Sequence, residues 1–398
     1  MPPILSDNPF VRATVTNFFF FFSLNSFILL PLYIHAQGGT EVEIGVVMGL
    51  YNAVGIVCQP LVGPWIDALG RRPFMLVGVG LVGASALLAA AAPLIPVLAL
   101  VRVMQGLGFS AFFVANYSYV IDLVPPDRRG WALGIYGVSG LTATAIAPLV
   151  GEWIVRRVGF RPLFVLAALL AGVACVLVTR LSGGRRGPAL PVRASLWERG
   201  GFDEIWHRPM AVTLFFGLGG GTIWVFLPTF AESLGVRTLA LFYTAYATAA
   251  IGVRVFGGRL LDTLGRAAVI VPSMFVQTIG TALLAMLALL VDRSGTTPAL
   301  PVLFLAGLMS GCAHGFLYPG LAALITDETP ETRRGVVVGI FSAVFLVGQT
   351  AGAFVFGYVT HAAGYAVTWS VLTALLLAGA GVSLRLVPAR PARRAILG

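Results

Sequence analysis

The chain has 398 residues, of which 58% are hydrophobic and 11% charged, and its formal net charge is +10. Soluble domains carry about 25% charged residues, so this composition excludes an ordinary soluble protein and predicts an integral membrane protein. None of the basic residues is Lys. A P-loop nucleotide site is therefore excluded, because that motif needs its Lys on the phosphates.

Long apolar stretches recur along the chain, and each has about 20 residues, enough to cross a hydrocarbon core of roughly 30 Å. Alternation with a period of two residues is absent, which argues against a β-barrel. We therefore predict an all-α membrane protein with two pseudo-symmetric six-helix bundles. Its twelve transmembrane helices are expected at residues 11–35, 43–66, 74–93, 96–123, 130–154, 161–181, 209–231, 238–261, 268–291, 299–325, 334–358 and 364–386.

One long polar stretch, rich in Gly, Pro and charged residues, separates the sixth and seventh predicted helices. This composition is typical of a linker. We predict an N-terminal bundle at residues 1–181, a cytoplasmic linker at 182–208 and a C-terminal bundle at 209–398. The three cysteines fall within predicted spans, so we expect no disulfide, no metal site and no cofactor.

The placement of the arginines predicts how the chain sits in the membrane. If both termini are cytoplasmic, most arginines outside the spans lie on the inner side, in agreement with the positive-inside rule. We therefore expect a multi-pass protein of the plasma (inner) membrane that works as a monomer. Anionic lipid is a sufficient partner for the positive charge, so we expect no nucleic-acid partner.

Two charged elements occur twice, in the same order. The pattern Gly-x-x-x-Asp-x-x-Gly-Arg spans residues 63–71 and returns at 258–266. The pattern Asp-x-x-Pro-x-x-Arg-Arg-Gly spans residues 122–130 and returns at 327–335. Charged turns beside lipid are costly, so two copies at corresponding places indicate that the chain consists of two similar halves.

These residues resemble the major facilitator superfamily. Residues 63–72, Gly-x-x-x-Asp-x-x-Gly-Arg-Arg, are similar to the signature loop between helices 2 and 3 of that family, and residues 258–266 to its weaker copy between helices 8 and 9. Arg102-x-x-Gln105-Gly106 is similar to the Arg-x-x-Gln-Gly motif of the fourth helix. Ala147-Pro-x-x-Gly-Glu152 resembles a degraded antiporter motif of the fifth. The resemblance implies a transporter, not an enzyme, whose halves rock around a central site.

The duplicated loops predict a conformational latch at the inner surface. Asp67 is expected to face the N-terminus of the eleventh helix, where a helix dipole favours a carboxylate, and Arg71 to pair with Asp122. The second half would repeat this arrangement. Alternatively, the charges only solvate the loops. The predicted latch residues are Gly63, Asp67, Gly70, Arg71, Asp122, Asp262, Arg266 and Asp327.

Ionisable side chains inside spans are costly and therefore indicate function. Four of them have a structural alternative. Arg102 could be a buried side chain bonded only to backbone carbonyls, and His314 a core residue. Arg254 could be a snorkelling side chain, and Glu152 a residue solvated at the interface. The candidates for proton coupling or substrate binding are Arg102, Gln105, Glu152, Arg254, His314 and Tyr318.

Other polar and aromatic residues of the spans are candidates for lining a cavity, although such residues also join helices. They are Asn25, Tyr51, Asn52, Asn116, Tyr117, Tyr136, Trp224, Tyr243, Tyr246 and Gln349. The first predicted helix has no carboxylate, and the charges within spans are mostly basic. This balance favours neutral or anionic cargo, because buried cations need nearby negative charge.

The family resemblance favours a drug or metabolite antiporter that exports a small organic molecule in exchange for protons. A proton symporter or facilitator for an organic anion or a sugar is the alternative within transport. A lipid-handling protein or membrane enzyme is the alternative from another class. The absence of a metal-spacing set and of a Gly-x-Ser-x-Gly elbow argues against an enzyme.

Overall fold

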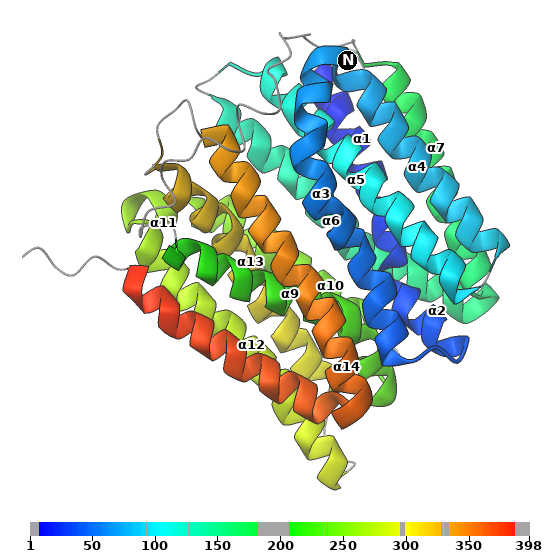
Figure 1. Cartoon of the computed structure of the whole chain (residues 1–398), viewed down its shortest axis with the longest axis vertical. Helices are drawn as coiled ribbons and strands as arrows, with labels where there is room; N and C mark the ends of the chain where they lie inside the picture. Colours follow the sequence, from blue (N-terminus) through cyan, green and yellow to red (C-terminus); the bar gives the residue numbers. More distant parts are fainter. Residues whose placement is uncertain are drawn as a thin grey trace, which may run out of the picture.

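The computed structural model describes residues 8–181 and 207–386, apart from residues 93, 126–127, 237, 295–298, 328 and 330–333. Asp67 and Asp262 are described in their backbone only. Within the described part the chain is helical and contains no strand (Figure 1). Only residues 207 and 208 of the predicted linker are described, and they belong to the helix that begins the second half.

The N-terminal half forms six spans, the first of which is interrupted by a short 3-10 segment, η1. Pro31 explains the interruption, because it cannot donate the hydrogen bond that a continuous helix would send to the carbonyl of Phe27. The elements are α1 (Pro9–Asn25), η1 (Ser26–Leu29), α2 (Leu30–Ala36), α3 (Glu41–Leu69), α4 (Arg71–Ala91), α5 (Ile95–Leu123), α6 (Arg129–Val158) and α7 (Phe160–Thr179).

The C-terminal half repeats this arrangement with three departures. Its first span, α9, is not interrupted. The span that begins with α10 contains a π-helical segment, η3. The 50-residue α14 holds two spans, because Gly364 has φ 76, outside the helical region. The elements are α9 (His207–Ser233), α10 (Ala240–Gly252), η3 (Val253–Gly257), α11 (Gly258–Thr263), α12 (Arg266–Ser294), α13 (Ala299–Asp327), α14 (Arg334–Ser383) and η5 (Leu384–Leu386).

The described part contains 11 helices that are long and apolar enough to cross a membrane. One of them, Val337–Leu386, covers nearly all of α14, and the kink at Gly364 divides it into two spans. When these are counted separately, every predicted span has a counterpart. The predicted fold class, an all-α membrane protein, is confirmed.

Backbone conformation reveals the duplication independently of the motifs. The described residues with positive φ are all glycines, and each one has a partner at the corresponding turn of the other half. A side chain is strained in this region, so glycine is required at these turns. The pairs are Gly38 with Gly235, Gly70 with Gly265, and Gly159 with Gly364.

The two halves pack together at one end only. We call the end with the turns at Gly70 and Gly265 the motif end, and the end with the turns at Gly159 and Gly364 the closed end. At the closed end one cluster of buried apolar side chains includes both halves. At the motif end the buried side chains form two clusters, one within each half. The halves are therefore joined at the closed end and separate at the motif end.

Glycines let α3 and α14 approach closely at the closed end, where Figure 1 shows the two helices converging. A Cβ atom added to Gly45 would lie 2.5 Å from the carbonyl oxygen of Ala353 and 3.1 Å from the Cα atom of Gly357. A Cβ atom added to Gly49 would lie 2.3 Å from the ring of Phe354. The contact between the halves therefore depends on the absence of side chains at these positions.

Two polar pairs also join the halves at the closed end. His35 Nδ1 lies 3.1 Å from Glu232 Oε2, which connects α2 to α9. His361 Nδ1 lies 3.1 Å from Glu41 Oε2, which connects α14 to α3. Each half supplies one histidine and one carboxylate to this contact.

Candidate functional site

A cavity of about 800 Å³ lies between the two halves. Its volume is within the range of roughly 300–1,000 Å³ that is typical of small-molecule sites. Its lining extends to Leu133 of α6 and Leu261 of α11, both near the motif end. The packed helices of the closed end block the other side, so the cavity is approached from the motif end.

Most of the residues predicted from sequence to bind, couple or line face this cavity. They come from both halves, which brings residues distant in sequence into a single site. The predicted residues that line it are Asn25, Tyr51, Asn52, Arg102, Tyr117, Tyr136, Trp224, Tyr246, Arg254, His314, Tyr318 and Gln349.

Arg102 lies in the wall formed by α5, and only 7% of its surface is exposed. Its Nη1 donates a hydrogen bond to Gln105 Oε1 at 2.8 Å, because residues three apart share a helix face. Its guanidinium carbon lies 4.8 Å from the centre of the Tyr51 ring, a cation–π contact. Gln105 is fully buried and does not line the cavity, so it serves to hold Arg102 in place.

Arg254 reaches the cavity from η3, the π-helical segment of the second half. π-helical turns are rare and frequently occur at functional sites. A Cβ atom added to Gly137 of α6 would lie 2.7 Å from Arg254 Nη1, so the guanidinium extends to the other half. Among the described residues no carboxylate pairs with Arg254, and its Nε has no hydrogen-bond partner.

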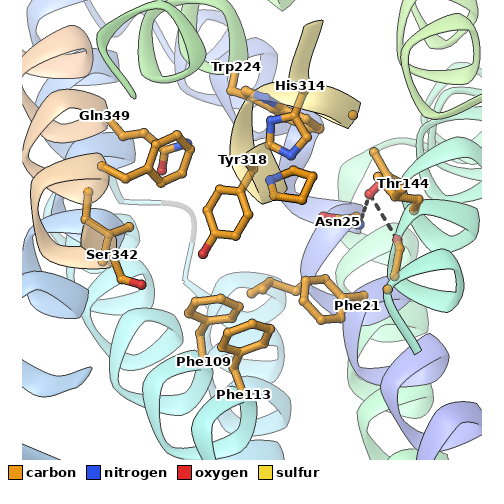
Figure 2. Close-up of a pocket in the computed structure, with 18 of the residues that line it drawn as sticks. Phe21, Asn25, Phe109, Phe113, Thr144, Trp224, His314, Tyr318, Ser342 and Gln349 are labelled. Carbon is orange, nitrogen blue, oxygen red and sulfur yellow. Dashed lines mark hydrogen bonds between the residues drawn. The ribbon is translucent and has the colours of Figure 1, made fainter. Parts of the chain in front are cut away.

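His314 and Tyr318 lie one turn apart on α13 and face the cavity (Figure 2). Their ring centroids are 6.1 Å apart. The His314 ring also lies 5.6 Å from the Tyr246 ring and 5.5 Å from the Phe216 ring. His314 is therefore an imidazole in an aromatic wall, with one side available to the cavity.

Aromatic side chains form both faces of the cavity. On α5, Phe109 and Phe113 stack with centroids 5.1 Å apart, and Tyr117 follows 5.9 Å from Phe113. On the opposite face the Tyr318 ring, which carries a hydroxyl, packs against the rings of Phe341 and Phe345, with centroids 5.3 and 5.4 Å away. Figure 2 shows that hydroxyl pointing towards Phe109 and Phe113 across the space. A planar apolar group can therefore contact rings from both halves at once.

A polar contact on the N-terminal side holds α1 against α6. Asn25 Nδ2 donates to Thr144 Oγ1 at 2.9 Å, and Thr144 donates to the carbonyl of Gly140 at 3.1 Å (Figure 2). Both Asn25 and Thr144 line the cavity. These side chains supply neutral polar groups beside the aromatic wall.

Two residues expected to line the cavity lie behind its wall instead. Asn116 is fully buried and donates to the carbonyl of Ala13 and the hydroxyl of Tyr136, at 3.4 and 3.3 Å, so it joins helices within the first half. Tyr243 is fully buried against Trp224, with ring centroids 5.1 Å apart. The sequence does not distinguish these two cases, because a polar group on an apolar helix faces either a cavity or a neighbouring helix.

Glu152 lies at the closed end and does not line the cavity. Its Oε1 accepts a hydrogen bond from the backbone N–H of Ala240 at 2.9 Å, and its Oε2 lies 3.6 Å from Arg156 Nη2. Ala240 is the first residue of α10, where the helix dipole favours a negative charge. Glu152 therefore links the two halves at the closed end.

The arginines of the duplicated loops lie beside carboxylates of their own half. Arg71 Nε is 3.3 Å from Asp122 Oδ2, and Arg266 Nε is 3.2 Å from Asp327 Oδ2. Each pair joins the start of one helix to the end of the following one. Both pairs are formed while the halves are separate at the motif end, so they do not themselves connect the halves in this state.

The glycines of these loops have a clear structural reason. Gly70 has φ 94 and Gly265 has φ 90, which permits the sharp turn between consecutive helices. Gly63 lies within α3, and a Cβ atom added there would meet no atom within 4 Å. The side chains of Asp67 and Asp262 lie outside the described residues, and their predicted contacts remain a proposal.

The charge of the cavity is positive. Its described lining includes Arg102 and Arg254 but no Asp or Glu. A cationic ligand here would lose its hydration without gaining a carboxylate partner. An anionic ligand would gain a guanidinium partner. The arrangement therefore suits neutral or negatively charged molecules.

Sequence reasoning missed several lining residues, notably Phe21, Phe109, Phe113 and Thr144. A usable signal existed for two of them, because Phe109 and Phe113 lie seven and eleven residues after Arg102 and so share its helix face. Phe21 lies in a run of five phenylalanines, where no pattern distinguishes a cavity-facing ring from a lipid-facing one.

A cavity between two pseudo-symmetric bundles of membrane-spanning helices is the architecture of a membrane transporter. The sequence model of the Major Facilitator Superfamily matches residues 13–294 and 209–397. The chain belongs to this family, as the sequence motifs predicted, and it is a multi-pass membrane protein.

Individual proteins resemble the chain over nearly its whole length. The staphylopine export protein of Staphylococcus aureus strain Mu50 is 24% identical over 380 residues, which cover 90% of each chain. A mutant of the nucleoside transporter NupG covers 95% of this chain and 100% of its own, with a TM-score of 0.75 and 16% identity. The human organic anion transporter MFSD10 covers 96% and 100%, with a TM-score of 0.66 and 17% identity. The structural matches establish a shared fold.

Proposed function

We propose that this chain exports a small organic molecule by alternating access, in exchange for protons. The observation that carries the proposal is the central cavity, which lies between two similar halves and is blocked at one end only. A site of this kind can face either side of the membrane if the halves rock.

The orientation follows from the arginines. Basic residues gather on the motif end, and by the positive-inside rule this supports a cytoplasmic position for that end and both termini, with the closed end outside. The cavity then faces the cytoplasm in this structure, which is the state that an exporter uses to load its cargo.

Release on the outer side requires the closed end to open. The contacts that must separate are the glycine-lined packing of α3 on α14, the two His–Glu pairs and the link from Glu152 to Ala240. Each of these contacts joins one half to the other, so all can break without unfolding either half. The Arg71–Asp122 pair stays within its half, where we propose that it fixes the loop that seals the motif end in the alternate state.

Two groups are suited to carry the proton. His314 lies in the cavity wall, and imidazole is the side chain whose charge changes near neutral pH. Glu152 lies at the outer contact, and protonation would remove the charge that holds it at the N-terminus of α10. A proton at either group would therefore alter the cavity or the closed end.

Export is favoured over uptake by two considerations. A relative that matches along most of the chain is named for staphylopine export. If the cargo is an anion, as the positive cavity suggests, a membrane potential that is negative inside also drives it outwards, by about 2.3 kcal/mol per charge and 100 mV.

Uptake or facilitated diffusion is the second candidate. It is favoured by the structural likeness to NupG, a nucleoside transporter. These mechanisms differ in how cargo movement depends on the proton gradient. An antiporter moves its cargo against the flow of protons, and a symporter moves its cargo with the protons. A facilitator moves its cargo at a rate independent of the gradient.

Purified protein in liposomes, with an imposed pH gradient, tests the proposal against a mixed library of metabolites and drugs. We expect at least one compound to move against its own gradient, towards the side from which protons leave. Protein-free liposomes and liposomes without a gradient are the controls. Movement of every transported compound at a rate independent of the gradient would overturn the antiport proposal.

A further inference from the structure

The two cavity arginines differ in what already holds them. Arg102 is nearly covered, hydrogen-bonded to Gln105 and stacked on Tyr51. Arg254 has neither a carboxylate partner among the described residues nor a hydrogen bond at Nε, although it lies in the cavity wall. A cation within a membrane span that lacks a partner is costly, so the position of Arg254 favours a site where an anion binds.

The backbone around Arg254 favours this role. The π-helical segment η3 carries the residue, and Gly137 on the facing helix leaves room for the end of its guanidinium. Any side chain at Gly137 would occupy that place, since even a Cβ atom would lie 2.7 Å from Nη1. The guanidinium of Arg254 therefore lies between the two halves, within reach of α6.

The rest of the cavity determines what the anion carries. Phe109 and Phe113 form an aromatic face on one half, and Tyr318 and His314 form one on the other (Figure 2). The space of about 800 Å³ is large enough for a fused ring system with substituents. Flat rings stack favourably between such faces, whereas a small hydrophilic anion such as phosphate would leave them unfilled.

We propose that the cargo is an aromatic organic anion, whose acidic group binds the guanidinium of Arg254 and whose ring lies between the aromatic faces. Gly137 acts as a positioning residue that keeps the guanidinium in reach of both halves. The inference rests on the proposed transport function for its biological meaning, but the binding itself requires neither a proton gradient nor a direction of transport.

Calorimetric titration of the purified full chain in nanodiscs tests the assignment with three probes of similar shape: 1-naphthoate, 1-naphthamide and 1-naphthylmethylammonium. We expect the carboxylate to bind about 10-fold or more tightly than the amide, and the ammonium to bind more weakly still. Equal or tighter binding of the ammonium would overturn the proposal.

Variants locate the site. Arg254→Gln should weaken 1-naphthoate binding about 10-fold or more while leaving 1-naphthamide binding unchanged, and Arg254→Lys should restore part of the loss. Gly137→Ala should weaken 1-naphthoate several-fold, because the new methyl group displaces only the end of a flexible side chain. Gly80→Ala on α4, where the methyl meets no atom within 4 Å, is the control.

Thermal unfolding of each variant distinguishes a local effect from a folding defect, since Gly137→Ala should unfold with the control. If Arg254→Gln binds 1-naphthoate as the parent does, the anion site is refuted even when proton-driven transport of another cargo is found. If the Arg254-dependent binding is found without proton-driven transport, the proposed function fails and the site stands.

Discussion

Substituting Gly45 by Ala should shift the protein towards the state in which the closed end is open. The added Cβ atom would lie 2.5 Å from the carbonyl oxygen of Ala353 and 3.1 Å from the Cα atom of Gly357. These are backbone atoms, so no side chain can rotate away, and α3 and α14 must separate by on the order of 1 Å to restore ordinary contact. The alternate state removes the strain, because this contact is then broken.

The size of the effect follows from the cost of overpacking, which is typically about 1–3 kcal/mol. If the whole cost falls on the present state, the ratio of open to closed populations at the outer end rises about 5-fold to 150-fold. The substitution therefore converts a local clash into a measurable redistribution between two conformations.

Distances between paired spin labels measure this redistribution. Labels at Leu69 and Leu264 report on the motif end, and labels at Val158 and Ala363 report on the closed end; all four positions are exposed. We expect Gly45→Ala to lengthen the second distance and shorten the first. Opposite changes at the two ends distinguish rocking from a general loosening.

Two glycines on α4 provide controls. A Cβ atom at Gly78 would lie 2.6 Å from the carbonyl of Gly108, an equally tight contact but within one half, so Gly78→Ala should lower thermal stability without changing either distance. Gly80→Ala should change neither stability nor distance, since its methyl group meets no atom within 4 Å. If Gly45→Ala behaves like Gly78→Ala, the glycine contact is ordinary packing and the reasoning is refuted.

Three further predictions concern the closed end and the proton. Glu152→Gln should raise the fraction of molecules whose closed end is open about 5-fold. A neutral amide accepts the hydrogen bond from the N–H of Ala240 more weakly than a carboxylate does, by roughly 1 kcal/mol. Unchanged spin-label distances would contradict this. In a cysteine-free background, His35→Cys and Glu232→Cys together allow a cleavable thiol cross-linker to join the two halves. We expect cross-linking to abolish transport and cleavage of the linker to restore it. Transport that persists while the link is intact would contradict the need to open this end. His314→Ala should transport at a rate independent of pH from about 6 to 8, and a retained parental pH profile would assign His314 to packing only.

Much of the fold could be predicted because bilayer-spanning length and turn chemistry leave clear marks in a sequence. The apolar stretches locate the spans, and Gly70 and Gly265 mark equivalent turns that need a positive φ. The interruption at η1 has a visible cause in Pro31, but the π-helical interruption of the second half could not be predicted. The π-helical segment at Val253–Gly257 has no sequence signature of its own.

The site was predictable in its chemistry more than in its geometry. An ionisable residue in a span stands out by its cost, and Arg102, Arg254 and His314 all line the cavity. Neutral polar residues do not reveal which way they face. Asn25 lines the cavity, whereas Asn116 lies behind its wall and joins α5 to α1 and α6, although both are asparagines within apolar spans.

The coupling of cargo to protons is the central claim, and the pH inside proteoliposomes tests it most directly. The vesicles hold a pH-sensitive dye and start with equal pH on both sides, and potassium with valinomycin clamps the membrane potential. Cargo identified in the liposome screen is then added outside. Antiport predicts that the lumen becomes alkaline, because cargo entering the vesicle drives protons out. A lumen that becomes more acidic than in protein-free vesicles, or that does not change while cargo enters, would contradict the account.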